Sequence, residues 1–174
     1  MKHLIAIIAV CLCQAFVAEA VTIGGSVGRK GEPYVTNGIT WQNVYLEGTK
    51  FKVTASIPGS PRSVLMNGNF KVESNYQDTY YWVETKGADD QRPPKSYEDL
   101  VKLFTNEKGN FHPLKNQMPK VRFAAEYTYT RNDGVPGVTH ILVSKRKMYI
   151  IGAVGKDLSL LKPFFESFNI VKED

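Results

Sequence analysis

The sequence contains only two cysteines, Cys11 and Cys13. Both lie in an N-terminal segment that we expect to be removed, so the remaining domain has no thiol. Without cysteine it cannot form a disulfide, a thiolate metal site or a cysteine nucleophile. Its stability must therefore come from the packing of apolar side chains.

The N-terminal segment has the features of a secretory signal peptide. Lys2 precedes an apolar run over residues 4–17, and Ala18-Glu19-Ala20 matches an A-x-A cleavage pattern. The run is shorter than the roughly 20 residues that a membrane-spanning helix needs. Bulky residues before both cysteines disfavour lipid attachment. We therefore expect residues 1–20 to be cleaved and the protein to be exported, periplasmic or secreted, with at most a peripheral association with a membrane.

The chain carries a formal net charge of +5, and its basic residues are dispersed along the sequence. Only Lys145-Arg146-Lys147 and Arg29-Lys30 are adjacent. Nucleic-acid binding favours a basic stripe interleaved with stacking aromatics, so we expect no nucleic-acid partner. In an exported protein a mildly basic surface favours an anionic membrane or polymer. The absence of an N-x-S/T sequon favours a bacterial envelope.

The chain is expected to hold one domain after a short lead. Residues 21–40 are rich in glycine and polar residues without a sustained period, and we interpret them as a flexible lead segment or a loosely attached strand. Gly24, Gly25 and Gly28 precede no Lys-Ser/Thr pair, so they do not indicate a phosphate-binding loop. Residues 41–174 form the single predicted domain, which begins at Trp41.

Apolar alternation predicts a series of antiparallel strands. Apolar and polar residues alternate over 51–57, and Asn67-Gly68 favours a tight hairpin between residues 63–66 and 69–74. Further strands are expected over residues 79–85, 121–130, 135–144 and 147–154. The last of these is apolar in succession, which is typical of a central strand covered on both faces.

Two helices complete the predicted fold. Ser96 can cap a helix that runs toward Gly109, and residues 157–168 carry a second apolar helical stripe. We expect Phe164 and Phe168 to point into the sheet and Phe165 to cover an edge. The stretch after the first helix, which contains Pro113 and Pro119, is expected to be irregular. The sequence thus predicts an α+β fold, a twisted antiparallel β-sheet with helices packed on it.

The order of these motifs resembles the PsbP/Mog-like sandwich superfamily, in particular its exported bacterial members. The resemblance covers roughly residues 49–171 and rests on Ile57-Pro58-Gly59-Ser60-Pro61, Gly134-Val135-Pro136-Gly137 and Phe164-Phe165-Glu166-Ser167-Phe168. It implies a twisted antiparallel sheet with helices on its faces and an accessory or binding role. No functional residue of the family can be carried over, and fold alone does not define function.

The candidate site residues are few. After the signal, the histidines are His112, expected in a loop, and His140, expected to be partly buried in a strand beside a polar neighbour. Neither has partners at the spacing of a zinc triad. Asp89-Asp90 lacks the spaced oxygen donors of a calcium loop, and Asp133 fits a turn. We therefore expect no catalytic, cofactor-binding or metal-binding residue and no cofactor.

The sequence favours a non-enzymatic accessory or binding domain of the cell envelope over an enzyme. Its expected partner is another envelope protein or envelope component. Two alternatives stay open: a hydrolase-type enzyme whose site residues come from loops, and a peripheral protein on an anionic membrane. The aromatic residues near the start of the domain are expected mostly in the core, although Tyr80 and Tyr81 must point to opposite faces of their strand.

Overall fold

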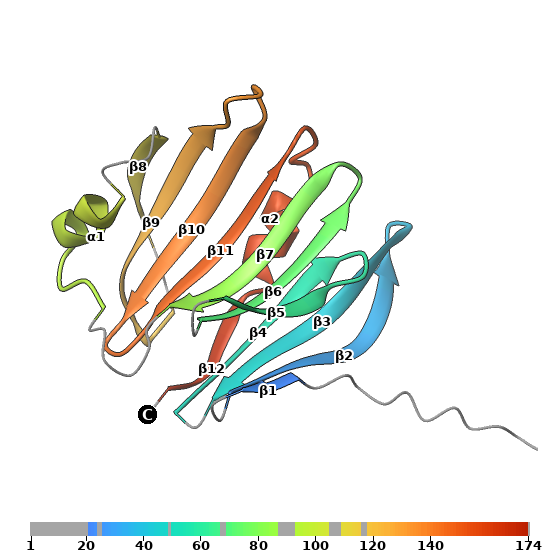
Figure 1. The fold of residues 1–174 in the computed structure, drawn as a ribbon, viewed down its shortest axis with the longest axis horizontal. Helices are drawn as coiled ribbons and strands as arrows, with labels where there is room; N and C mark the ends of the chain where they lie inside the picture. Colours follow the sequence, from blue (N-terminus) through green and yellow to red (C-terminus); the bar gives the residue numbers. More distant parts are fainter. Residues whose placement is uncertain are drawn as a thin grey trace, which may run out of the picture.

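The computed structural model describes residues 21–23, 26–48, 50–66, 69–86, 93–104, 109–115 and 118–173. They form two antiparallel sheets and two short helices (Figure 1). Sheet A has the order β1 (Val21–Ile23), β2 (Ser26–Thr36), β3 (Ile39–Gly48), β4 (Phe51–Pro58) and β12 (Asn169–Glu173). Sheet B has the order β5 (Arg62–Met66), β6 (Asn69–Tyr76), β7 (Thr79–Lys86), β11 (Met148–Gly155), β10 (Pro136–Ser144), β9 (Val121–Thr130) and β8 (Gly109–Leu114).

The predicted antiparallel architecture is confirmed, but its division into two sheets was not expected. The predicted strands appear as β4 to β7 and β9 to β11, and β5 pairs with β6 as a hairpin. The sequence analysis predicted an α+β fold with one twisted sheet and two helices, whereas the chain has two sheets, its two helices are short, and it is largely β. Alternation within a strand specifies which face is buried, not which sheet the strand joins.

The lead segment contributes strands, in agreement with the second of its two interpretations. β1 pairs with β2, and β2 pairs with β3 along most of its length, with a register shift between Lys30 and Pro33. The side chains of residues 32–36 are exposed, including Tyr34 and Val35. Because this strand buries little on either face, it lacks the apolar alternation by which strands are recognised in a sequence.

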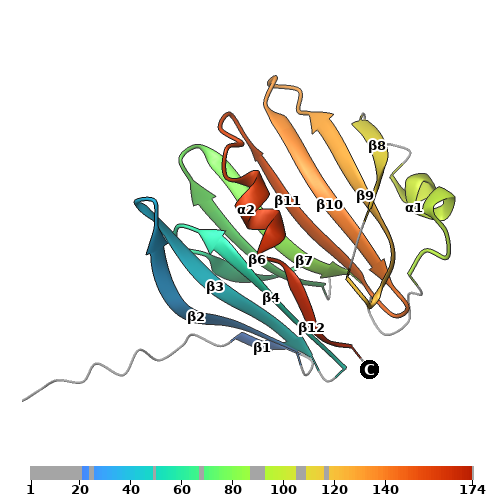
Figure 2. The same ribbon diagram turned by 180° about the vertical axis from the view of Figure 1, so that it is seen from behind.

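The main core lies between the two sheets. We call the face of sheet B that points toward sheet A and α2 (Leu161–Glu166) its inner face; Tyr81 and Tyr149 lie on it. Figure 2 shows α2 lying against this face beside β11. Phe164 is fully buried, and its ring meets Tyr81 edge-on at a centroid distance of 5.3 Å. The core is filled by apolar side chains from both sheets.

The C-terminal helix is shorter than predicted. α2 ends at Glu166, and Phe168 lies in the two-residue connection that leads into β12. Phe164 and Phe168 are both buried as predicted, while Phe165 stacks on His140 at 3.8 Å between ring centroids. Pro163 and the two-residue connection to β12 limit the helix to about two turns.

The outer face of sheet B, opposite the inner one, is partly covered by α1 (Tyr97–Leu103). Ser96 caps this helix as predicted, because its hydroxyl accepts a hydrogen bond from the Asp99 backbone N–H at 3.1 Å. Leu100 is fully buried against β9, β10 and β11. β11 is therefore covered on both faces, as its apolar run indicated.

β8 lies in the stretch that was expected to be irregular. It is one of the two edge strands of sheet B and pairs only with β9 among the described strands. Pro113 is tolerated there because an edge strand needs hydrogen bonds on one side only. Most of its side chains are exposed, so the sequence offers no alternation to detect it.

Candidate functional site

The strand registers bring basic residues from separate segments to one end of the molecule. β9 begins beside the end of β10, so Lys120 lies next to the turn that carries residues 145–147. β11 begins opposite Lys86, the last residue of β7, and Lys172 of β12 pairs with Lys52 of β4. We call this region the basic end; its cations are Lys50, Lys52, Lys86, Lys120, Arg122, Lys145, Arg146, Lys147 and Lys172.

Direct contacts hold the two sheets together at the basic end. The Lys147 ammonium lies 4.6 Å from the centroid of the buried Phe51 ring of β4. The Arg146 backbone N–H donates to the Glu173 carboxylate of β12 at 3.3 Å. These contacts fix the turn between β10 and β11 beside β4 and β12. The cations of this turn therefore lie next to those of sheet A.

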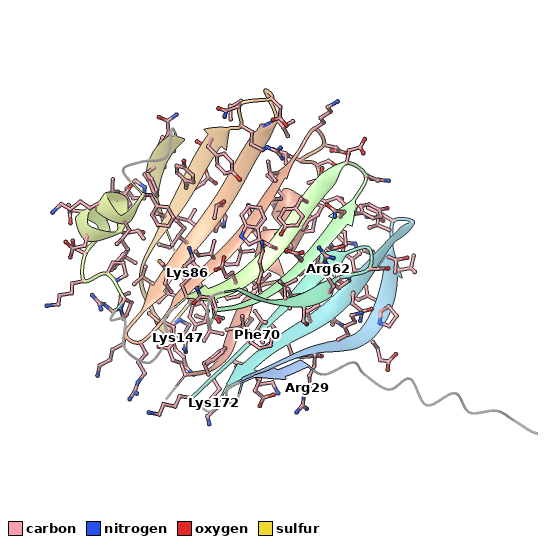
Figure 3. All side chains as sticks on the ribbon, viewed as in Figure 1. Arg29, Arg62, Phe70, Lys86, Lys147 and Lys172 are labelled. Carbon is pink, nitrogen blue, oxygen red and sulfur yellow. The ribbon has the colours of Figure 1, made fainter. Side chains whose placement is uncertain are left out.

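The positive charge of the basic end exceeds the negative charge around it. Lys52 pairs with Glu47 at 3.6 Å, but Lys50, Lys120 and Lys145 are exposed and have no carboxylate partner among the residues that the structure describes. Figure 3 labels Lys86, Lys147 and Lys172, which lie together in the lower part of the view. The basic end is thus a cationic surface built from both sheets.

The opposite end of the molecule shows no comparable excess of positive charge in its described turns. Arg131 pairs with Asp133 at 2.9 Å in the turn between β9 and β10. Lys162 of α2 pairs with Glu166 at 2.6 Å. Asp78 lies in the turn between β6 and β7. The charge of the domain is therefore asymmetric along the direction of the strands.

The folded chain thus gathers at one end basic residues that are far apart in the sequence. They are dispersed in the sequence because they lie at strand ends and turns that occur at intervals along the chain. In an antiparallel sheet every second turn lies at the same end, so residues that are distant in sequence become neighbours. The spacing of the predicted strands was the signal from which this clustering could have been inferred.

His140 is part of a polar row on the inner face of sheet B. Its Nε2 lies 3.2 Å from a carboxylate oxygen of Glu126, which is the neighbour that the sequence analysis expected. The Phe165 ring stacks on the imidazole. Burial lowers the pKa of His140, although the hydrogen bond with Glu126 acts in the opposite direction. His112 lies across from Glu126, in β8 rather than in a loop, and its side chain is exposed.

Among the described residues, this row has neither a hydroxyl partner for His140 nor a third metal ligand. The described contacts of His140 are with Glu126 and Phe165, and no serine or threonine hydroxyl is hydrogen-bonded to its ring. Within the same part of the chain, no three His, Cys, Asp or Glu side chains converge as metal ligands. The pair is therefore best described as a half-buried acid–base contact beneath α2.

A second polar cluster lies on the outer face of sheet B. Glu73 accepts hydrogen bonds from Arg62, at 2.8 and 3.0 Å, and from the Tyr80 hydroxyl, and it pairs with Lys71 at 3.2 Å. Burial raises the pKa of Glu73, but these hydrogen bonds more than offset it and hold the pKa below its ordinary value. Tyr80 stacks on Trp82 with the Lys71 ammonium above both rings. The charged and polar groups of this cluster are thus hydrogen-bonded or paired with one another.

The other candidate residues are only partly covered by the structure. Asp133 forms a turn as predicted, because its carboxylate accepts from the Val135 backbone N–H at 3.3 Å. Asp89, Asp90, the glycines at 24 and 25 and the whole predicted signal peptide lie outside the described residues. Within the described part, no helix has the length and hydrophobicity to cross a membrane.

Comparison with known proteins adds no assignment. No protein-family model matches the chain, and no curated protein matches it.

Proposed function

We propose that this protein is an exported, non-enzymatic binding domain that docks onto an anionic membrane surface through its basic end. The observation that carries the proposal is the convergence of cations from both sheets at one end, beside turns that hold them next to one another. The membrane association is peripheral, and the domain stays folded outside the hydrocarbon region.

The magnitude of the electrostatic attraction is sufficient for reversible docking. A Lys or Arg held near an anionic leaflet contributes about 1 kcal/mol, and the attraction decays within a Debye length of roughly 8 Å at physiological salt. A cation therefore contributes only if it faces the membrane together with its neighbours. Lys50, Lys120 and Lys145 meet this condition when the strands stand upright on the surface.

The resemblance to the PsbP/Mog-like sandwich remains part of the proposal. Antiparallel sheets with short helices on their faces are compatible with that superfamily, and its accessory and binding roles agree with a domain whose interior is filled by a hydrophobic core. We retain export on the basis of the sequence of residues 1–20. The partner is the lipid surface, and the group that the basic end binds is the acidic phospholipid head group.

Co-sedimentation with vesicles tests the docking. We compare vesicles of phosphatidylcholine alone with vesicles that contain phosphatidylglycerol, using Lys50→Gln/Lys120→Gln/Lys145→Gln and the matched control Arg131→Gln/Lys156→Gln/Lys162→Gln at the opposite end. The first variant should bind anionic vesicles about 100-fold more weakly, because three contributions of about 1 kcal/mol are lost. The control should bind like the unmodified protein.

Two results would contradict the proposal. One is equal weakening in both triple variants, since net charge alone would then explain binding. The other is crosslinking in intact cells that recovers a single envelope protein, with the same yield from Lys50→Gln/Lys120→Gln/Lys145→Gln as from the unmodified protein. Sequencing of the N-terminus after cell fractionation tests export separately, with a mature start at Val21 as the expected result.

A further inference from the structure

We infer that the inner face of β8, β9 and β10 binds a neutral sugar in a hollow at the end of sheet B away from the basic end. The inference goes beyond membrane docking and does not depend on it, because the two regions lie at opposite ends of the strands. It assigns a ligand to a part of the inner face that the hydrophobic core does not use.

The strand registers place the polar side chains of this surface on one face. Leu114, Ala124 and Leu142 pair across β8, β9 and β10 and pack on the main core, which defines the inner side of all three strands. Because side chains alternate between faces, residues two and four positions farther along each strand also point inward. The first of these rows is His112, Glu126 and His140, and the second is Asn110, Thr128 and Val138.

The second row lies in a hollow that is open to solvent. Figure 2 shows sheet A on one side of α2 and strands β8 and β9 on the other, so sheet A does not cover this region. The hollow has a volume of about 560 Å³, within the roughly 300–1,000 Å³ of small-molecule pockets. Around it Asn110 and Thr130 are exposed, and Thr128 is half-buried. A ligand of one or two sugar rings can therefore enter it.

Two aromatic rings on the outer face support the floor of the hollow. Gly109 and Gly137 contribute to this floor through their backbone. On the outer face the Tyr127 ring lies against Gly109 and the Tyr129 ring against Gly137, where a Cβ would clash with them. The two rings stack on each other with 5.2 Å between centroids. The floor is thus held in place before a ligand arrives, which lowers the entropic cost of binding.

The two sides of the hollow differ in polarity, as the parts of a pyranose do. Pro136 and Val138 of β10 present apolar surface beside the backbone of Gly137. Asn110 of β8 and Thr128 of β9 present an amide and a hydroxyl, each of which both donates and accepts hydrogen bonds. Neither side chain is hydrogen-bonded to another residue in the part of the chain that the structure describes. A pyranose can cover the apolar side with its C–H face while its hydroxyls bind the polar side.

The charges beside the hollow favour a neutral ligand. Glu126 lies in the adjacent inward row, where its side chain is 35% exposed and hydrogen-bonded to His140. Burial lowers the pKa of His140, so the imidazole is uncharged at neutral pH and the carboxylate repels an anion. Arg131, in the adjoining turn, already pairs with Asp133 at 2.9 Å. A cation would meet one carboxylate that has a partner, whereas hydroxyl groups match the amide and hydroxyl of the hollow.

Titration with soluble sugars tests the site without a membrane. Cellobiose and N,N′-diacetylchitobiose are the neutral probes, and glucuronic acid is the anionic one. We expect a neutral probe to bind more tightly than glucuronic acid. In NMR spectra of the unmodified protein, it should shift the backbone amide signals of Gly109, Thr128 and Gly137 and leave that of Lys145 at the basic end unchanged.

The variant Asn110→Leu/Thr128→Val removes the polar side of the hollow at nearly constant volume. It should weaken sugar binding by about tenfold or more, because each lost hydrogen bond lowers the affinity by about three- to tenfold. Asn169→Leu/Thr54→Val is the matched control. Asn169 is likewise an exposed asparagine on an edge strand and pairs with the half-buried Thr54 of the neighbouring strand. This control should bind the sugar like the unmodified protein.

Several results would overturn the inference. They are the absence of binding for both neutral probes, tighter binding of glucuronic acid, and equal weakening in the two double variants. Circular dichroism verifies that each variant is folded. Should Asn110→Leu/Thr128→Val not fold, the amide shifts of the unmodified protein decide, and shifts that avoid Gly109, Thr128 and Gly137 overturn the site. Vesicle binding that persists without sugar binding leaves the docking proposal intact, so the two claims fail separately.

Discussion

The hydroxyl of Tyr149 donates a hydrogen bond to the Glu173 carboxylate at 2.9 Å. Tyr149 belongs to β11 of sheet B and is fully buried, whereas Glu173 is the last residue of β12 in sheet A. The contact therefore joins the sheets across the basic end. Burial raises the pKa of Tyr149, and the neighbouring carboxylate raises it further, so the hydroxyl remains protonated.

Removing this hydroxyl should weaken the connection between the sheets. Tyr149→Phe is expected to lower the free energy of unfolding by about 1.5–3 kcal/mol, as for a hydrogen bond to a charged group. Urea denaturation measures the change. In a double-mutant cycle with Glu173→Ala, which removes the acceptor, a coupling energy near zero would show that the two side chains do not support each other.

The buried histidine should make stability depend on pH. The pKa of His140 is lowered from 6.5 in the folded protein, so below that pH the unfolded chain binds more protons than the folded one. Stability is then greatest above about pH 6.5 and falls as the pH decreases, by at most about 1.4 kcal/mol per pH unit for this single group.

Thermal unfolding between pH 5 and 8 measures this dependence. His140→Gln, which can still hydrogen-bond to Glu126, should flatten the curve relative to the unmodified protein. A pH dependence that is unaffected by His140→Gln would assign it to other groups.

The segment after α2 should be essential for the core. Phe168 is 2% exposed and packs against the Tyr149 ring, with 5.9 Å between centroids. Phe168→Ala should cost about 3–5 kcal/mol, a large part of a typical domain stability of about 5–15 kcal/mol. Leu103→Ala, at a side chain that is 64% exposed, should change stability by less than about 0.5 kcal/mol. Equal melting temperatures for both variants would show that the C-terminal segment does not contribute to the stability of the core.

The Trp82 indole lies flat on the outer face of sheet B because Gly152 has no side chain. A Cβ at Gly152 would lie 2.3 Å from the indole Cζ2, so the ring must move. Gly152→Ala should destabilise the domain by about 1–3 kcal/mol, as overpacking typically does. In a Trp82→Leu background the same change should cost much less. An identical cost in both backgrounds would exclude the indole as the cause.

The sequence was informative where the apolar and polar residues of an element follow a regular local pattern, but β3, which buries Trp41, Val44 and Leu46 without strict alternation, was not predicted. The alternation over residues 51–57, the Asn67-Gly68 pair and the Ser96 cap each predicted an element that the structure contains. Phe164 and Phe168 were placed in the core for the same reason. These are local patterns, and their physical cause, burial of one face or satisfaction of a helix end, acts within a few residues.

Features that depend on the arrangement of distant segments could not be predicted in this way. β2 and β8 bury little and carry Pro33 and Pro113, so they resemble loops in the sequence. The contact of His140 with Phe165 joins β10 to α2, which no spacing indicates. The basic end depends on the strand order and register of two sheets, so basic residues that are dispersed in the sequence gather only in the folded chain.

The orientation of the domain on an anionic membrane tests the central claim most directly. A fluorophore that reports local polarity is attached through Lys145→Cys at the basic end or Lys156→Cys at the opposite end, so each labelled protein loses one cation. Cys11 and Cys13 are removed with the signal or changed to serine. On vesicles that contain phosphatidylglycerol, the label at 145 should shift to shorter wavelength, and high salt should reverse the shift, while the label at 156 stays unchanged. Equal shifts at both positions, or a shift at 156 alone, would contradict docking through the basic end.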